Sequence, residues 1–493
     1  MTAITPSSTG GNTPPDAAHA PTLPPKDSGA DGSGARRATP RPLVYGPSHP
    51  MGNARILIER CFTQEQALLL AHHRGAVREW DGRAWPEMEE AAVREAVWVF
   101  FENAEYISKE KLVPFRPNRS KVADIVEALK AIALVRDRVE MPSWRSEPGA
   151  SPTEILPMAN GLLHVPNRQL LPATPGFFNA YAVPYPYDPT ASTPDLWLAF
   201  LDELWPADEQ SKLTLQEVIG YLLMSDTSQQ KIIFLVGPKR SGKSTIARVI
   251  RGLLGGHNVA GPTLASLGTN FGLQALIDKP VAIIADARLG GRTDRSVVTE
   301  RLLTISGEDT ITADRKYKGH WTGTLPTRLV IISNETPALS DTSGALASRF
   351  LVLKTDRSFY GDEDPTLTRQ LLVELPGILQ WALDGYDRLQ ARGHFTQPDS
   401  ATDVIDEMND LASPVAAFIR DRCEMDPAFD EPTHGMYNAW VAWCEEHGRR
   451  PSNAQTFGRD LRAVHPEVQT SQRRTGHDDE RERVYRGIRV RAR

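Results

Sequence analysis

One stretch near the middle of the chain restricts its fold more than any other feature. The apolar run Ile232 to Val236 is followed by glycines at 237 and 242 and then by a segment with helical periodicity. Apolar residues recur in that segment at the spacing of one helix face: Ile246, Val249, Ile250, Leu253 and Leu254. The pattern predicts a buried parallel strand, a tight turn and a helix that ends at Gly255-Gly256.

The turn in this stretch has the spacing G-x-x-x-x-G-K-[ST] of a nucleotide phosphate-binding loop. Backbone N–H groups at a helix N-terminus favour phosphate, and side chains at the glycines would block its approach. Lys243 can neutralise the β- and γ-phosphates, and the Ser244 hydroxyl can ligate Mg²⁺. Chance would produce the pattern in roughly 2% of chains this long. We therefore expect ATP and Mg²⁺ as cofactors, with these binding residues: Gly237, Pro238, Lys239, Arg240, Ser241, Gly242, Lys243, Ser244 and Thr245.

Two later apolar runs predict further strands of the same sheet. The run from Val281 ends at Asp286, a carboxylate that could hold Mg²⁺ through water. The run from Leu329 ends at Asn334, whose amide could orient a water that attacks the γ-phosphate. An acidic turn and an asparagine cap are the structural alternatives.

Arg349 follows a stretch of small residues after these strands. An arginine at this position can reach the γ-phosphate held by a neighbouring subunit, and such fingers contribute roughly 10³–10⁵ in rate. Spacing alone does not distinguish a finger from an ordinary arginine.

Residues 310–322 alternate around Lys318-Gly319 and predict a hairpin. Its tip carries Arg315, Lys316 and Lys318, with Tyr317 and Trp321 beside them. Positive charge with aromatic rings suits the backbone and bases of single-stranded DNA, so the three cations are candidate DNA contacts. The alternative is a hairpin that is simply solvated.

In this order the motifs resemble superfamily 3 helicases of the AAA+ class, in particular the primase-helicases of phages, plasmids and poxviruses. The resemblance implies a ring, commonly a hexamer, with ATP at subunit interfaces and basic hairpins in the central channel. It also implies individual roles: phosphate and Mg²⁺ binding by Lys243 and Ser244, Walker B for Asp286, sensor 1 for Asn334, the finger for Arg349, and channel contacts for Lys316 and Lys318.

The chain departs from the family pattern at one point. The family has two adjacent acidic residues in Walker B, whereas Asp286 is followed by Ala287 and Arg288. Either Asp286 serves both purposes, or Glu335 or Glu308 supplies the second carboxylate, or hydrolysis is lost.

Composition divides the remainder of the 493 residues. Residues 1–42 are rich in Pro, Gly, Ser and Thr and predict a disordered tail. Residues 43–192 predict a helical N-terminal domain, with a hairpin about Asp81-Gly82, and an irregular connector; they resemble the domain that precedes the motor in phage and poxvirus proteins. The motor is expected at 193–395. Residues 409–493 predict three helices and a hairpin, a winged-helix-like DNA-binding domain, in which residues 471–493 hold eight arginines against four acids.

Several classes of protein are disfavoured. No window approaches the ~20 apolar residues of a membrane span, and the N-terminus lacks an apolar signal region. The three cysteines form no C-x-x-C pair, which fits a reducing cytoplasm, here that of a bacterial host. A net charge of −6 excludes a uniformly basic nucleic-acid binder.

The expected fold is therefore multidomain α/β: a P-loop AAA+ motor with a helical N-terminal domain and a C-terminal winged-helix-like domain. The expected function is an ATP-dependent DNA helicase of a phage, prophage or plasmid, translocating as a ring on single-stranded DNA. Expected partners are single-stranded or forked DNA, further copies of the chain as a hexamer, and a separate primase or replication initiator, but no membrane. The alternatives are an ATP-gated loading ring with slow hydrolysis, a primase-helicase subunit working with a separate primase, a primase itself, and a non-replicative P-loop ATPase.

Overall fold

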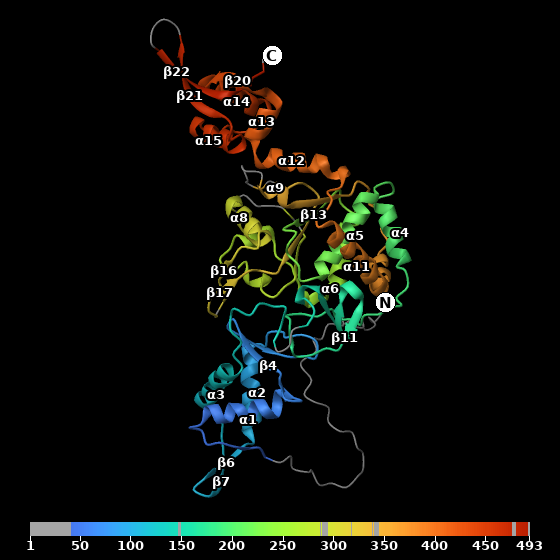
Figure 1. Cartoon of the computed structure of the whole chain (residues 1–493), viewed down its shortest axis with the longest axis vertical. Coiled ribbons are helices and arrows are strands. Elements are labelled where there is room, and N and C mark those ends of the chain that lie inside the picture. The colour runs from blue at the N-terminus through green and yellow to red at the C-terminus, as the bar shows by residue number, and fades with distance from the viewer. Residues whose placement is uncertain are drawn as a thin grey trace, which may run out of the picture.

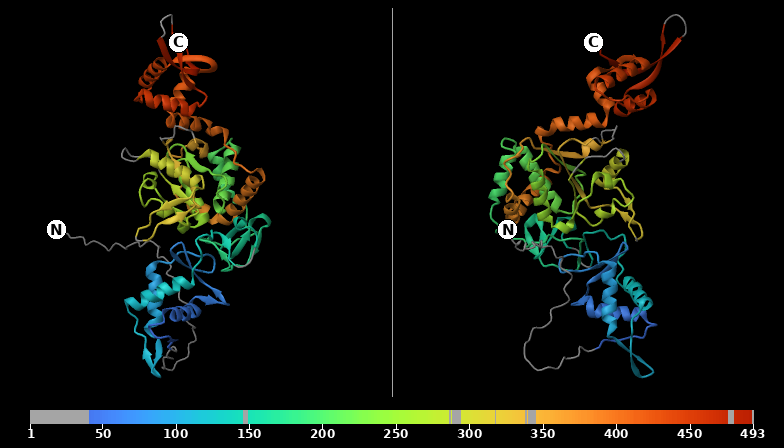
Figure 2. Two further views of the ribbon diagram at one scale, coloured as in Figure 1. Left: turned by 60° about the vertical axis from the view of Figure 1, so that its left-hand side comes forward. Right: turned by 180° about the vertical axis from the view of Figure 1, so that it is seen from behind.

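A computed structural model describes residues 41–145, 149–285, 287, 294–316, 318–337, 339, 345–475 and 480–491. The protein is a multidomain α/β protein that contains a parallel sheet. An N-terminal unit (residues 41–145), a central unit (149–412) and a C-terminal unit (413–491) follow one another along its longest axis (Figures 1 and 2).

The N-terminal unit combines helices with short strands, so it is less purely helical than its sequence predicts. Helix α2 buries Val93, Val97 and Phe101 on one face, as their spacing requires. A parallel pair of strands and three antiparallel hairpins accompany the described helices of this unit. The elements are β1 (Leu43–Val44), α1 (Pro50–Cys61), β2 (Thr63–Gln64), β3 (Ala67–Leu68), β4 (Leu70–His73), β5 (Ala76–Glu79), α2 (Glu90–Glu102), β6 (Glu105–Ser108), β7 (Lys111–Pro114) and α3 (Arg119–Ile132).

The turn predicted about Asp81-Gly82 is present: the Asp81 N–H donates to the Ala84 carbonyl at 3.1 Å, and Arg78 and Glu87 form an isolated antiparallel bridge on either side of it. The hairpin β4–β5, which precedes it, was not predicted; it turns at Arg74-Gly75, where both residues have positive φ. Such a two-residue turn matches the twist of the flanking strands. In the predicted turn, the Asp81 carboxylate accepts hydrogen bonds from the N–H groups of Arg83 and Ala84.

Between the N-terminal unit and the motor elements lies the region predicted to be an irregular connector. It contains an antiparallel sheet in the order β11-β10-β9 and the strand pair β8–β12. The bounds are β8 (Ser143–Trp144), β9 (Ile155–Met158), β10 (Gly161–His164), β11 (Gln169–Leu171) and β12 (Phe177–Phe178).

The central unit is built on a sheet whose five described strands run parallel in the order β14-β15-β18-β13-β19. Alternate residues of each strand face opposite ways. One face packs on α4, α5, α6 and α11, and the other on α7, α8 and α12. The strands are β13 (Ile232–Val236), β14 (Val259–Ala260), β15 (Val281–Ile284), β18 (Arg328–Ser333) and β19 (Phe350–Lys354); the helices are α4 (Asp195–Leu204), α5 (Glu209–Leu223), α6 (Lys243–Leu254), α7 (Leu264–Leu267), α8 (Arg295–Ser306), α9 (Ala345–Arg349), α10 (Leu367–Leu371), α11 (Leu375–Arg392) and α12 (Thr402–Ala412).

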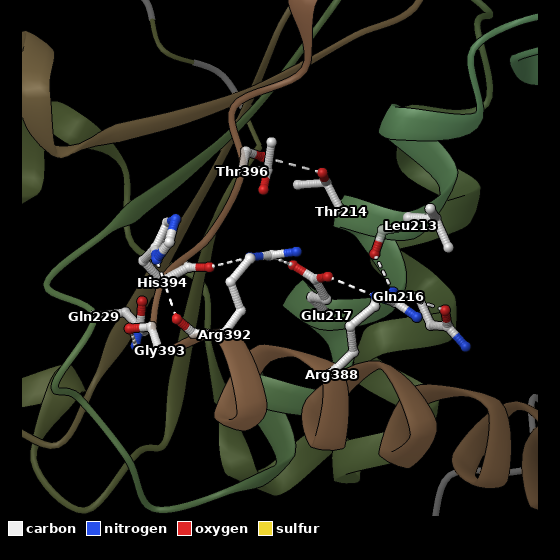
Figure 3. A network of polar contacts seen from close by, with 10 residues as sticks. All are labelled: Leu213, Thr214, Gln216, Glu217, Gln229, Arg388, Arg392, Gly393, His394 and Thr396. Atoms are coloured by element: carbon white, nitrogen blue, oxygen red, sulfur yellow. Dashed lines mark hydrogen bonds and ion pairs between the residues drawn. The ribbon is translucent and has the colours of Figure 1, made fainter.

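Helices α5 and α11 lie against each other on one face of the sheet. A Cβ added at Gly220 would lie 2.2 Å from the carbonyl oxygen of Ala382, so the helices approach at a distance that only glycine permits. Polar side chains join the same pair of helices (Figure 3). Glu217, 2% exposed, accepts from Arg388 Nε at 2.7 Å and Arg392 Nη2 at 2.5 Å. This ion pair fixes the end of α11 to α5.

Strands β16 (Ile311–Ala313) and β17 (Trp321–Gly323) form the predicted hairpin of the central unit. Its tip lies against the β4–β5 turn of the N-terminal unit, because Arg315 Nη2 donates to the Arg74 carbonyl at 3.2 Å. Arg78 reaches in the same direction and forms an ion pair with Asp278 at 2.5 Å. The two units therefore share a polar interface.

The C-terminal unit has its own core, centred on Phe418, Trp440 and Phe457. The three predicted helices and the predicted hairpin are present, and Asn453 caps the last helix by accepting from Thr456 N at 2.9 Å. Strand β20, which no sequence pattern indicated, pairs with β22 in the order β20-β22-β21. The elements are α13 (Pro414–Arg422), β20 (Cys423–Pro432), α14 (Thr433–Glu446), α15 (Ala454–Val464), β21 (Gln469–Thr475) and β22 (Glu480–Val490).

Helix α12 packs into the central core through Val404 and Met408, so it continues the central unit beyond residue 395 and leads to the C-terminal unit. None of the described helices is both long and apolar enough to cross a membrane.

Candidate functional site

The glycine-rich loop (residues 237–244) connects the buried strand β13 to helix α6. Gly242 caps the helix with φ +78°, a left-handed conformation that favours glycine. A Cβ at Gly242 would also lie 2.7 Å from Leu204 Cδ2. At Gly237 a Cβ would lie 2.1 Å from the Thr355 carbonyl oxygen. The backbone can follow this path only with glycine at both positions.

The N–H groups of this loop are available to a ligand. Among the described residues, no hydrogen bond is made by the backbone N–H of any residue from Lys239 to Ser244. They gather at the N-terminus of α6, where the helix dipole adds positive potential. Such a set of unpaired donors fits an anion with several oxygens, such as the phosphates of a nucleotide.

Lys243 lies over the loop and is 5% exposed. Its Nζ donates to the carbonyls of Gly237 at 2.8 Å and Pro238 at 2.7 Å, and to Ser241 Oγ at 3.0 Å. Burial lowers the pKa of Lys243 to about 8, because the charged form loses hydration without a carboxylate nearby. An anion placed beside Nζ would stabilise the ammonium form and raise this pKa.

Asn334 follows β18, the strand that pairs directly with β13. Its Oδ1 accepts from Lys243 Nζ at 3.3 Å. The parallel register pairs Val236 with Ser333, so the ends of the two strands lie side by side. Two predicted site residues that are far apart in sequence are thus brought together by the sheet.

The predicted Mg²⁺ ligands are only partly described. Asp286 lies outside the described residues, although β15, which precedes it, pairs with β18 as expected for a strand of this site. The Ser244 side chain is exposed at the start of α6. Among the described residues, no group of three or more His, Cys, Asp or Glu side chains could hold a metal ion.

Glu308 and Glu335 are the two candidates for the second carboxylate. Glu308 lies far from Lys243 in the structure. Glu308 accepts from Thr227 Oγ1 and from Gln230 Nε2, and both partners precede β13. The glycine-rich loop follows the same strand, so within one chain Glu308 lies at the N-terminal end of β13 and Lys243 at its C-terminal end. Glu335, which follows Asn334, is exposed at the loop edge.

Arg349 also lies at the N-terminal end of β13, whereas the glycine-rich loop follows the C-terminal end of this strand. Residue 350 pairs with Ile232 at the beginning of β13, whereas Lys354 pairs with Val236 at its end. At about 3.3 Å per residue, strand β13 separates Arg349 from the loop by roughly 15 Å. Arg349 therefore cannot contact a phosphate bound at the loop of its own chain.

The hairpin cations differ in how much of their charge is available. Arg315 is buried, and its Nε donates to the Gly319 carbonyl at 3.1 Å. Lys318 forms an ion pair with Glu87 of the N-terminal unit. The side chain of Lys316 is exposed, and its backbone N–H donates to Gln274 Oε1 at 3.0 Å.

The aromatic residues of the hairpin do not support the expected stacking role. Trp321 is 5% exposed, because its ring packs into the central core and the Arg74 guanidinium lies 5.7 Å from its centroid. The prediction that Trp321 offers a face to a base is therefore wrong. Tyr317 lies outside the described residues.

A cleft of about 460 Å³ lies between the hairpin and the N-terminal unit, beside the contacts of Arg315 and Lys318. Arg315, Lys318 and His320 line it from the hairpin, and Glu87, Glu90 and Lys130 from the helices and loops opposite. No sequence pattern indicated this cleft, because it forms between segments that are far apart in the chain.

A segment that was not predicted as part of the site, residues 355–359, closes over the glycine-rich loop. Thr355 N donates to the Val236 carbonyl at 2.8 Å, and Thr355 Oγ1 lies 2.8 Å from Ser241 Oγ. Further along, Phe359 N donates to the Arg240 carbonyl at 2.8 Å. No local pattern marks these residues, because they reach the loop only through the pairing of β19 with β13.

The arginines of the C-terminal hairpin are partly neutralised. Arg473 pairs with Glu482, Arg486 with Asp430, and Arg489 with Glu424. On α15, Arg459 and Arg462 are exposed, and Arg459 lies 3.2 Å from Asp460. The positive surface is thus smaller than the arginine count suggests.

Three family models match separate segments of the chain, and none spans half of it. Residues 54–206 match a model described as "D5 N terminal like". Residues 235–349 match a "Family of unknown function (DUF5906)". Residues 413–492 match the "RFX DNA-binding domain".

Among solved structures, the chain is similar to "The A form apo structure of NrS-1 C terminal region-CTR", with 12% identity and a TM-score of 0.49 over 84% of this chain and 93% of that one. A second structure of that region, "The A form apo structure of NrS-1 C terminal region-CTR(305-718)", has the same identity and TM-score and covers 89% of this chain and 99% of that one. A likeness at this level does not establish a shared fold.

Proposed function

We propose that this chain is an ATP-dependent DNA helicase that works as a ring of identical subunits in the replication of a phage, prophage or plasmid. The observation that carries the proposal is the position of Lys243 and Arg349 at opposite ends of the parallel strands of one sheet. Lys243 follows the C-terminal end of β13, and Arg349 lies beside its N-terminal end. A site that needs both residues is complete only where two copies of the chain meet. Head-to-tail contacts of this kind close into rings, here a hexamer.

In this proposal the central unit is an AAA+ motor of superfamily 3. ATP phosphates bind the unpaired N–H groups of the glycine-rich loop and Lys243. Ser244 and Asp286 hold Mg²⁺, which neutralises charge that develops on the transferred phosphoryl group. Asn334 orients the attacking water, and Arg349 of the next subunit stabilises the transition state.

DNA is the proposed track and partner. The C-terminal unit matches a family that is named for DNA binding, and its helices with a β21–β22 hairpin suit a winged helix. The hairpin with Arg315, Lys316 and Lys318 is proposed to face a single strand in the ring. A separate primase or replication initiator would act with this helicase in the cytoplasm of a bacterial host.

DNA-stimulated ATP hydrolysis tests this proposal. The wild-type chain is expected to hydrolyse ATP faster with single-stranded DNA and to separate a forked duplex, whereas Asp286→Asn does neither. Turnover should be measured with and without DNA, and strand separation with a labelled fork. Wild-type turnover no faster than that of Asp286→Asn would overturn the motor.

One observation favours a second candidate, an ATP-gated ring that loads on DNA and hydrolyses slowly. Asp286 is followed in the sequence by Ala287, which is 2% exposed. Glu308 is held at the N-terminal end of β13, away from the glycine-rich loop of its own chain. ATP-dependent DNA binding without DNA-stimulated turnover would identify this candidate.

The ion pair between Lys318 and Glu87 leads to a prediction about DNA affinity. Glu87 competes with a DNA phosphate for Lys318, and the pair is partly exposed. Glu87→Gln is expected to tighten binding of a single-stranded oligonucleotide about two- to fivefold, the range of a surface ion pair. Fluorescence anisotropy at low salt measures this change.

Glu90→Gln is the matched control, because Glu90 lines the same cleft without an ion pair to Lys318 among the described contacts. It removes the same charge from the cleft but should change affinity less. Equal tightening by both variants would mean that net charge, and not release of Lys318, is responsible.

A further inference from the structure

Arg349 is held at one end of its guanidinium. Each side-chain hydrogen bond that the described structure gives Arg349 uses Nη1: to Gln230 Oε1 at 2.5 Å, to the Gln230 carbonyl at 3.5 Å and to the Ser306 carbonyl at 3.4 Å. A guanidinium has five N–H donors in a rigid plane. Fixing Nη1 therefore orients Nη2 and Nε, which together can bind two oxygens of one phosphate.

The Gln230 side chain is itself fixed from the other side. Its Nε2 donates to Glu308 Oε2 at 3.2 Å, while Oε1 of the same amide accepts from Arg349. Glu308 is in turn held by Thr227 Oγ1. The amide can neither rotate nor flip without breaking one of these bonds, so the chain Thr227–Glu308–Gln230 sets the direction of Arg349.

A neutral amide at this position has a specific consequence. It orients Arg349 without cancelling its charge, whereas a direct carboxylate partner would compete with a phosphate for the guanidinium. The Gln230 amide stands between the negative charge of Glu308 and the guanidinium of Arg349. The next residue, Lys231, donates from Nζ to the Ser348 carbonyl at 2.6 Å and so holds the backbone just before Arg349.

We propose that Gln230 is the positioning residue of the arginine finger: it aims Arg349 at the phosphates bound by the adjacent subunit. The inference rests on the proposed function. It adds a link between two sites, because Gln230 immediately precedes Lys231 and β13, the strand that ends at the glycine-rich loop of the same chain. The loop that binds one nucleotide and the finger aimed at the next are thus carried by one rigid strand.

The test measures DNA-stimulated ATP turnover of the full chain for four proteins: wild type, Gln230→Ala, Arg349→Ala and the double variant. Gln230→Ala is expected to lower kcat about 10²-fold, the cost of a misplacement near 1 Å, with KM for ATP unchanged. In the Arg349→Ala background, Gln230→Ala should have no further effect, because it acts only through Arg349.

Gln229→Ala is the matched control. Gln229 is the neighbouring glutamine, and its Nε2 donates to the Gly393 carbonyl at 3.1 Å, away from Arg349. It should leave kcat within about twofold of wild type, since the substitution removes one exposed hydrogen bond. A loss in Gln229→Ala equal to that in Gln230→Ala would overturn the proposal in favour of a general structural role.

The outcomes separate this inference from the proposed function. If Arg349→Ala keeps wild-type turnover, the finger assignment fails. If Arg349→Ala is slow but Gln230→Ala is not, the finger stands and the positioning role of Gln230 is overturned. If the two losses add in the double variant, Gln230 acts independently of Arg349 and the inference is likewise overturned.

Discussion

Arg349→Ala should lower ATP turnover by roughly 10³-fold or more while leaving ATP binding to the glycine-rich loop unchanged, as for known fingers. The physical reason is position. Arg349 lies about one strand length from the loop of its own chain, so it contributes nothing to binding there. In the proposed function it acts on the neighbour, where it would meet charge that develops in the transition state. Turnover and equilibrium binding of a fluorescent ATP analogue measure the two effects separately.

Mixing two inactive variants distinguishes a finger in the adjacent subunit from a residue that acts within its own chain. In the proposed function, Lys243→Ala removes the phosphate contact and Arg349→Ala removes the finger, so each variant alone is expected to be inactive. In randomly mixed rings, an interface combines an intact Lys243 with an intact Arg349 about a quarter of the time. An equimolar mixture is therefore expected to regain up to about a quarter of wild-type turnover if interfaces act independently.

The contrary result is equally clear. A mixture as inactive as its parts, with both variants still forming mixed rings by native mass spectrometry, would place Lys243 and Arg349 in one chain's site or in none. Lys243→Arg offers a control, since it keeps the charge but not the compact ammonium that fits between the loop carbonyls.

The second large effect concerns stability. Glu217→Ala is expected to destabilise the central unit by about 2–4 kcal/mol, less than a fully buried pair because both arginines are about a third exposed. Glu217 is the shared partner of Arg388 and Arg392 (Figure 3), and its removal leaves two like charges facing each other between α5 and α11. For a unit of this size the melting temperature should fall by about 5–10 °C, as differential scanning fluorimetry would record.

Glu209→Ala is the matched control on the same helix. Glu209 pairs with Lys212 in the first turn of α5, where it is largely exposed. Its loss should cost at most about 0.5 kcal/mol. Equal shifts for the two glutamates would mean that the Glu217 ion pair adds nothing beyond a surface contact.

Local patterns were sufficient for the elements around the loop. The apolar run of β13, the glycine at 242 and the helical spacing after it correspond to a strand, a left-handed cap and a helix in the structure. The same holds for the β16–β17 hairpin. These features depend on short-range backbone preferences and on periodicity, which a single sequence carries.

Other features had no local signal. The turn at Arg74-Gly75, the strand β20 and the burial of Trp321 depend on packing against segments far along the chain. Sequence patterns left Glu308 and Glu335 both open as the second carboxylate. Only the tertiary structure showed that Glu308 lies away from Lys243. Residues that hold others in place, such as Gln230 and Thr355, match no motif because their partners are distant in sequence.

The sequence by itself determined that this chain has a glycine-rich loop between a strand and a helix, with a lysine at the start of the helix, because spacing and glycine conformation are local properties. Only the tertiary structure decided which side chains share an edge of the sheet. It brought Asn334 within hydrogen-bonding distance of Lys243 at the C-terminal ends of the strands, and Arg349 within hydrogen-bonding distance of Gln230 at the N-terminal end of β13. The physical reason is that a parallel sheet aligns distant strands by their order and register, which no short stretch of sequence specifies.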